Sequence, residues 1–155
     1  MWVGLVVGRE TLLPLTVPLV ISYAIILIRI GKISIQQVLL PAAIGISIDS
    51  AFTLFGMYSF SNTNLLLPIW LITLWIAFST TLTQSLAFIG KYWPVAAVAG
   101  AIAFPFNYAI GERLGAVAFA DPYILTLLTV GLTWLFCFPL LFFVVDERFK
   151  KKLAT

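Results

Sequence analysis

The sequence contains no histidine and only one cysteine, Cys137, in a chain of 155 residues. Without histidine it cannot form a Ser-His-Asp triad, and without a second cysteine it cannot form an internal disulfide or a dithiol redox pair. The Cys and His ligands of a structural zinc site are missing as well. These absences exclude many enzyme classes, and the sequence predicts neither a metal nor a cofactor.

Charged residues are also scarce. They make up 10% of the chain, against about a quarter of a typical soluble domain, whereas 62% of the residues are hydrophobic. A core of this size cannot bury such long apolar runs, so the composition predicts an integral membrane protein. The net charge of +3 does not indicate nucleic acid, because the basic residues lie at the ends of the apolar runs and form no basic surface.

Five apolar segments reach the roughly 20 residues that a helix needs to cross a bilayer core. They cover approximately residues 12–30, 36–56, 65–89, 94–117 and 123–145. The sequence therefore predicts an all-α, polytopic transmembrane helical bundle in one integral membrane domain of residues 1–155. A short apolar N-terminal stub, residues 1–8, is too short to cross, and we expect an interfacial anchor or the remnant of a further span. Its lack of a basic cluster argues against a cleaved signal peptide.

The lysines and arginines indicate the orientation of the predicted spans. If the five spans alternate, Arg9 and Arg113 lie on one side of the membrane. The other side carries Arg29, Lys32, Lys91, Arg148, Lys150, Lys151 and Lys152. Because short cytoplasmic loops retain positive charge, this division predicts an external N-terminus and a cytoplasmic C-terminus.

Asp49 is the most informative polar residue, because it lies at membrane depth in the second predicted span. A carboxylate there must be protonated, paired or in contact with water. Arg113, near the outer end of the fourth span, is the partner that we expect for it, and Glu10 is the second candidate partner of Arg113. The alternative is that Glu112 and Arg113 simply mark the outer water interface.

Similar depths in the second, third and fourth spans predict a polar pocket in the outer half of the bilayer. Its candidate residues are Asp49, Thr80, Asn107, Tyr108, Glu112 and Arg113. A secondary polar stripe on the third span consists of Thr73, Thr81 and Gln84, and we expect it to join helices by hydrogen bonds. Small residues such as Gly100 and Gly111 predict that the fourth span is packed centrally.

Three stretches of the spans carry a family resemblance: GISIDS at 45–50, WIAFSTTLTQSL at 75–86 and GAIAFPFNYAIGERLGAV at 100–117. On these stretches, and across about residues 12–145, the chain resembles the small bacterial inner-membrane proteins catalogued as domain of unknown function 2878. The resemblance implies a multi-pass protein of the bacterial inner membrane, with a periplasmic N-terminus in the orientation above. Members of the family look like six-span proteins, so residues 1–8 resemble the end of a first span.

Thr83 and Gln84 stand where the family pattern often looks like Asn-His, so a proton-transferring imidazole is absent. Members look to be encoded beside enzymes that modify membrane fatty acids, which implies an association with lipid modification but no reaction.

The leading hypothesis is a non-catalytic protein that binds lipid or partner proteins as an accessory to membrane lipid modification. Its expected partners are membrane lipids and lipid-modifying enzymes, with a homo-oligomer as a further option. One alternative is an enzyme acting on a lipid, with Asp49 or Glu112 as general acid or base, Thr80, Asn107 and Tyr108 orienting it, and Arg113 holding an anion. The other is a small proton-coupled carrier with Asp49 as its titrating site.

Overall fold

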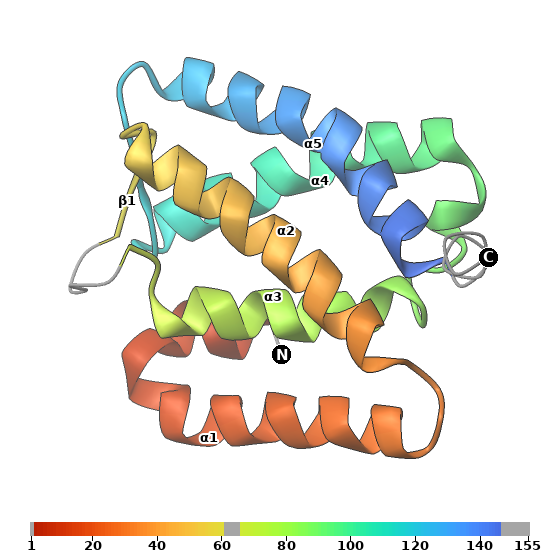
Figure 1. The fold of residues 1–155 in the computed structure, drawn as a ribbon. Helices are drawn as coiled ribbons and strands as arrows, with labels where there is room; N and C mark the ends of the chain where they lie inside the picture. Colours follow the sequence, from red (N-terminus) through yellow and green to blue (C-terminus); the bar gives the residue numbers. More distant parts are fainter. Residues whose placement is uncertain (1, 61–65, 147–155) are drawn as a thin grey trace.

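The protein is built almost entirely of α-helices, as a computed structural model that describes residues 2–60 and 66–146 shows (Figure 1). The elements are α1 (Trp2–Arg29), α2 (Ile35–Leu54), β1 (Tyr58–Ser59), α3 (Ile69–Leu82), the 3-10 turn η1 (Ile89–Lys91), α4 (Trp93–Arg113), β2 (Ala118–Phe119) and α5 (Tyr123–Val145). The basic tail from Arg148 to Lys152 and residues 61–65, where the third span was expected to begin, lie outside the described residues.

The predicted all-α membrane bundle is confirmed. Within the described ranges, α1, α2, α4 and α5 are long and apolar enough to cross a membrane. Helix α3 is shorter than the predicted segment 65–89, because its 14 residues span only about 21 Å. The polar run Thr83-Gln84-Ser85 forms turns that end this helix early.

Helix α1 consists of two helical segments with a break at Arg9, whose φ of 36° and ψ of −126° are not helical. The segment before the break, here called the octet (residues 1–8, described from residue 2), packs against the bundle on one side. Leu5 and Val6 are buried in the same core as Leu71 of α3. Only one side of the octet is covered by protein, since Val3 and Val7 are exposed, so its position at the membrane interface stays a prediction.

Arg9 fixes the octet to the end of α4. Its guanidinium donates to the carbonyl oxygen of Gly115 at 2.7 Å and to that of Leu114. The last carbonyls of a helix have no partner within the helix, and a cation at this end also suits the helix dipole. Gly115, with a φ of 68°, provides the left-handed residue that turns these carbonyls outward.

Replacing Arg9 by glutamine is expected to lower the free energy of unfolding by about 1.5 to 3 kcal/mol, the usual range for hydrogen bonds to a charged group. Thermal unfolding of the full chain in detergent measures this loss. Arg113→Gln is the matched control, since Arg113 is exposed at the end of α4. Equal melting temperatures for the two variants would contradict the role of Arg9.

The helices form two groups in contact. Helix α3 lies against α1 and α2, α4 packs along α5, and α5 also contacts α2 (Figure 1). At one face of the bundle, β1 and β2 pair antiparallel and join the segments that follow α2 and α4. Gln37 connects α2 to the end of α5 by donating its side-chain N–H to the carbonyl of Val145 at 2.8 Å.

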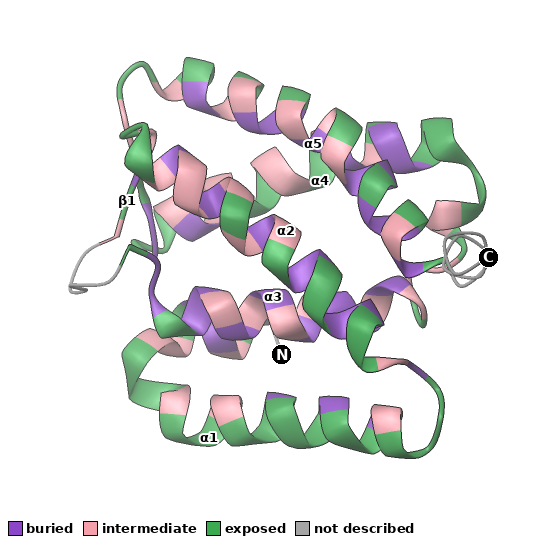
Figure 2. Ribbon diagram, viewed as in Figure 1, coloured by how far each residue is buried: buried purple, intermediate pink, exposed green. Residues whose placement is uncertain are grey.

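The prediction that the fourth span is packed centrally is wrong. Helix α4 buries one narrow side, which includes Ala96, Gly100 and Gly111, whereas Ile102 and Phe106 are exposed. Helices α2 and α5 bury a larger share of their residues (Figure 2). Small residues permit a close approach to a neighbour, and here that neighbour is chiefly α5.

Candidate functional site

Asp49 is fully buried near the middle of the bundle, with no exposed surface. One carboxylate oxygen accepts a hydrogen bond from the indole N–H of Trp75 at 2.7 Å. The other accepts from the hydroxyl of Tyr108 at 2.6 Å. A buried carboxylate is costly unless it is hydrogen-bonded, and these two bonds join α2 to α3 and α4 at one point.

Gly45 makes the bond between Asp49 and Trp75 sterically accessible. It lies one helical turn before Asp49 and therefore on the same face of α2. A Cβ atom at this position would overlap the ring of Trp75. The absence of a side chain lets the indole lie against the α2 backbone with its N–H at the carboxylate.

An aromatic cluster continues from Trp75 into the bundle. The ring of Trp134, from α5, stacks on Trp75 at a centroid distance of 5.2 Å and on Phe104 at 3.8 Å. Trp134 has no exposed surface, and its indole N–H is buried without a hydrogen-bond partner among the described residues. These near-parallel rings from α3, α4 and α5 pack against one another beside the bonds of Asp49.

Tyr58 extends the aromatic cluster toward the β1–β2 ladder. Its ring stacks on Tyr108 at 5.1 Å and on Phe119 at 5.5 Å. Its hydroxyl is buried without a partner in the described part of the chain. Burial raises the pKa of Tyr58 above its ordinary value and the Asp49 carboxylate raises it further, so the phenol stays neutral.

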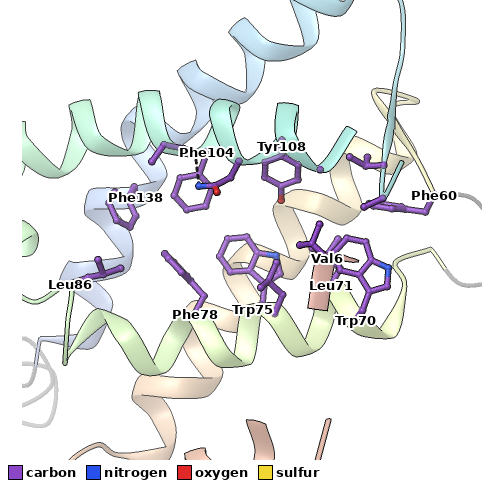
Figure 3. Close-up of a pocket in the computed structure, with 16 residues that line it drawn as sticks. Val6, Phe60, Trp70, Leu71, Trp75, Phe78, Leu86, Phe104, Tyr108 and Phe138 are labelled. Atoms are coloured by element: carbon purple, nitrogen blue, oxygen red, sulfur yellow. Dashed lines mark hydrogen bonds between the residues drawn. The ribbon is translucent and has the colours of Figure 1, made fainter. Parts of the chain in front are cut away.

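A cavity of about 290 Å³ lies between α3 and α4 (Figure 3). Trp75 and Phe78 of α3 face Phe104 and Tyr108 of α4 across it, and Phe138 of α5 lies beside Phe104 (Figure 3). Val6 of the octet also lines it, beside Leu71 and Trp70. Nearly all of its lining is apolar, and nearly half of the lining residues are aromatic.

The cavity has a mouth on α4. Ala103 and Asn107 both line the cavity and are both exposed on the surface of the protein. They lie one turn apart inside an apolar helix that is long enough to cross a membrane. The cavity therefore has exposed lining on the side of a helix that is long enough to cross a membrane.

The predicted pocket residues are only partly brought together. Asn107 and Tyr108 line the cavity, and Asp49 lies directly behind Tyr108. Thr80 is buried and donates to the carbonyl of Ala77 at 2.7 Å. Glu112 is half-buried in the last turn of α4, and neither it nor Arg113 lines the cavity.

The ion pair expected between Asp49 and Arg113 does not form. Both oxygens of Asp49 are occupied by neutral donors, and Arg113 is exposed at the end of α4. The predicted pocket is not polar. It is an apolar cavity with a polar edge, and no charged side chain lines it. The placement of Glu112 and Arg113 agrees with the alternative that they mark an interface.

The secondary stripe on the third span does not join helices. Thr73 donates to the carbonyl of Ile69 at 2.9 Å, and Thr81 donates to that of Phe78 at 2.6 Å. Gln84 is exposed in the turn after α3. Hydroxyls in helices commonly bond to the carbonyl three or four residues earlier, so these side chains satisfy their hydrogen bonds within their own segment.

Sequence reasoning missed Trp75, Tyr58 and Val6. For Trp75 a signal existed, because a tryptophan within a span needs a partner for its N–H and Asp49 offers an acceptor at similar depth. Tyr58 and Val6 carry no comparable signal, because their roles depend on how the β1 segment and the octet fold back on the bundle.

Apolar helices of spanning length, a buried carboxylate that joins two of them to the shorter α3, and an apolar cavity with exposed lining on α4 define a polytopic helical membrane protein. Within that class, the chain belongs to the family described as "Protein of unknown function (DUF2878)", which it matches over residues 1–140. The predicted family is thus confirmed. Neither the curated proteins nor the solved structures provide a match.

Proposed function

We propose that this protein is a lipid-binding accessory protein of the bacterial inner membrane that takes part of a membrane lipid into the cavity between α3 and α4. The observation that carries this proposal is the exposure of Ala103 and Asn107 at the cavity mouth, halfway along a spanning helix. At that depth the surroundings are lipid, so an apolar molecule can enter without crossing water. The apolar lining with few polar groups is typical of small-molecule sites.

The position of Asp49 favours binding over catalysis or proton transport. Its carboxylate does not line the cavity, and both of its oxygens are already bonded to Trp75 and Tyr108. A general acid or a titrating carrier site must reach the substrate or the transported proton. Asp49 instead positions two walls of the cavity.

The excess of basic residues on one side of the predicted spans supports an orientation with the C-terminus in the cytoplasm. In that orientation the β1–β2 ladder and Arg113 face the periplasm. An association with lipid-modifying enzymes is part of the same proposal, and it follows from the lipid that the cavity would present to them.

Photolabelling tests whether a lipid chain enters the cavity. The full chain is placed in vesicles of phosphatidylethanolamine and phosphatidylglycerol that contain a diazirine-bearing hexadecanol, and labelled residues are mapped by mass spectrometry. We expect label on the lining residues Leu74 and Phe78 of α3. Ala103→Phe places a ring in the mouth and is expected to reduce that label several-fold.

Ala43→Phe is the matched control, because Ala43 is exposed on α2 and does not line the cavity. It is expected to leave the labelling of Leu74 and Phe78 unchanged. Label spread evenly over lipid-facing residues, or equal labelling in Ala103→Phe and the wild type, would contradict lipid entry.

A further inference from the structure

The polar groups around the cavity differ in whether a ligand can use them. The indole N–H of Trp75 and the hydroxyl of Tyr108 are both donated to Asp49. Asn107 donates one side-chain N–H to the carbonyl of Ala103 at 2.8 Å. An amide carries two N–H donors and a carbonyl acceptor, so most of its hydrogen-bonding capacity remains at the cavity mouth.

The depth of Asn107 limits the charge of its partner. It lies about 9 Å along α4 from Arg113, and therefore below the interface that Arg113 marks. A charged phosphate or carboxylate would be costly at this depth, and no lysine or arginine lines the cavity to pair with one. The group that meets Asn107 must therefore be uncharged.

The walls of the cavity favour a flat, unsaturated group. The rings of Trp75 and Phe104 are nearly parallel, with an angle of 16° between their planes and their centroids 6.1 Å apart. Tyr108 and Phe78 add further ring surface. Aromatic faces and edges attract planar π systems through offset and edge-to-face stacking, beyond the attraction of burial alone.

The size of the cavity limits how much of a ligand it can hold. Small-molecule pockets usually occupy about 300 to 1,000 Å³, and this one lies just below that range. A whole two-chain phospholipid does not fit, whereas one ring with its substituents does. A hydrocarbon tail on that ring would leave through the mouth at Ala103 and Asn107 into the surrounding lipid.

We infer that the cavity binds the uncharged, planar, carbonyl-bearing ring of a membrane lipid, the chemistry of a quinone headgroup. The ring lies among Trp75, Phe104 and Tyr108, and the Asn107 amide donates to a ring carbonyl. This inference rests on the proposed function and names the class of lipid that the cavity selects.

The test compares two probes with equal decyl tails. Decylubiquinone has the planar ring and the carbonyls, and decylcyclohexane has neither. Each is titrated against the full chain in nanodiscs, and binding is followed by the rise in melting temperature and by competition with the photoreactive hexadecanol. We expect decylubiquinone to bind saturably and at least about tenfold more tightly than decylcyclohexane.

Asn107→Leu removes the amide, and Thr129→Leu is its control. Thr129 bonds to the carbonyl of Leu125 one turn earlier, as Asn107 does to that of Ala103, but lies outside the cavity. We expect Asn107→Leu to weaken decylubiquinone binding about tenfold and leave decylcyclohexane binding unchanged. Thr129→Leu should change neither.

Two outcomes would overturn the inference while leaving lipid binding intact. In the first, decylcyclohexane competes as well as decylubiquinone. In the second, Asn107→Leu binds decylubiquinone as tightly as the wild type does. If neither probe binds and the photoreactive hexadecanol also fails to label the cavity, the proposed function is wrong as well.

Discussion

Replacing Asp49 by leucine is expected to destabilise the protein more than any other single substitution of a polar residue described above. The substitution leaves the N–H of Trp75 and the hydroxyl of Tyr108 buried without an acceptor. Each unpaired buried donor costs about 1 to 3 kcal/mol, so the expected loss is about 2 to 6 kcal/mol. Unfolding of the full chain in detergent with increasing dodecyl sulfate or temperature measures it.

Asp49→Asn should be milder, for a specific reason. The amide oxygen can still accept from Trp75, and the phenol of Tyr108 can turn to accept from the amide N–H. The indole has no such freedom, since it only donates. Equal losses for Asp49→Asn and Asp49→Leu would therefore show that hydrogen bonding is not what Asp49 contributes.

Two comparisons separate the hydrogen bonds of Asp49 from the effect that any replacement of aspartate by leucine has on stability. Asp121→Leu makes the same change at an exposed position before α5 and is expected to be nearly neutral. In a double-mutant cycle, Tyr108→Phe should cost little more once Asp49 is already leucine, because the bond is lost in either case. Additive losses would mean that the 2.6 Å contact carries no coupling energy.

The second large effect is expected at Gly100, where α4 lies closest to α5. A Cβ atom there would overlap the backbone carbonyl oxygen of Trp134 and lie 2.6 Å from the Cβ of Phe138. Backbone cannot move aside cheaply, so Gly100→Ala is expected to separate the two helices. Overpacking of this kind costs about 1 to 3 kcal/mol, and Gly100→Leu should cost more.

Gly111→Ala is the control on the same helix. Its Cβ would meet only the side chain of Val117 at 3.7 Å, an ordinary contact. Because alanine favours helix over glycine, this variant is expected to gain up to about 1 kcal/mol. Opposite signs for the two alanine variants support the close contact at Gly100, whereas a stabilised Gly100→Ala would contradict it.

The helices were predictable because crossing a bilayer requires a length that the sequence displays directly. The start and end of α5 agree with the predicted 123–145, and α2 and α4 begin within one residue of their predicted starts. The octet was not predictable, because a short apolar run looks the same whether it lies on the interface or packs against α3. The structure shows packing against α3 through Leu5 and Val6, which no pattern in the sequence marks.

The candidate site could be predicted from the sequence only in part. That Asp49 needs partners follows from the cost of a buried carboxylate, but opposite charge at a neighbouring depth pointed to Arg113. The indole and phenol donors that actually bond to it are neutral, and the indole reaches it because Gly45 leaves space on α2. Asn107 and Tyr108 were predicted at the site, whereas the apolar character of the cavity depends on rings contributed by separate helices.

The pairing of β1 with β2 makes the two ends of the cavity differ in how their backbone segments are connected. The ladder joins the segments after α2 and α4 next to Phe60 and Val117, which line the cavity on that side. At the opposite end, near Leu86 and Phe138, the described residues hold no such pairing: the turns of residues 83–92 connect α3 to α4, and Phe138 of α5 packs against Phe78 and Phe104 through side chains alone. A guest larger than the resting volume would therefore spread the two helices asymmetrically, with the displacement concentrated at the end away from the ladder.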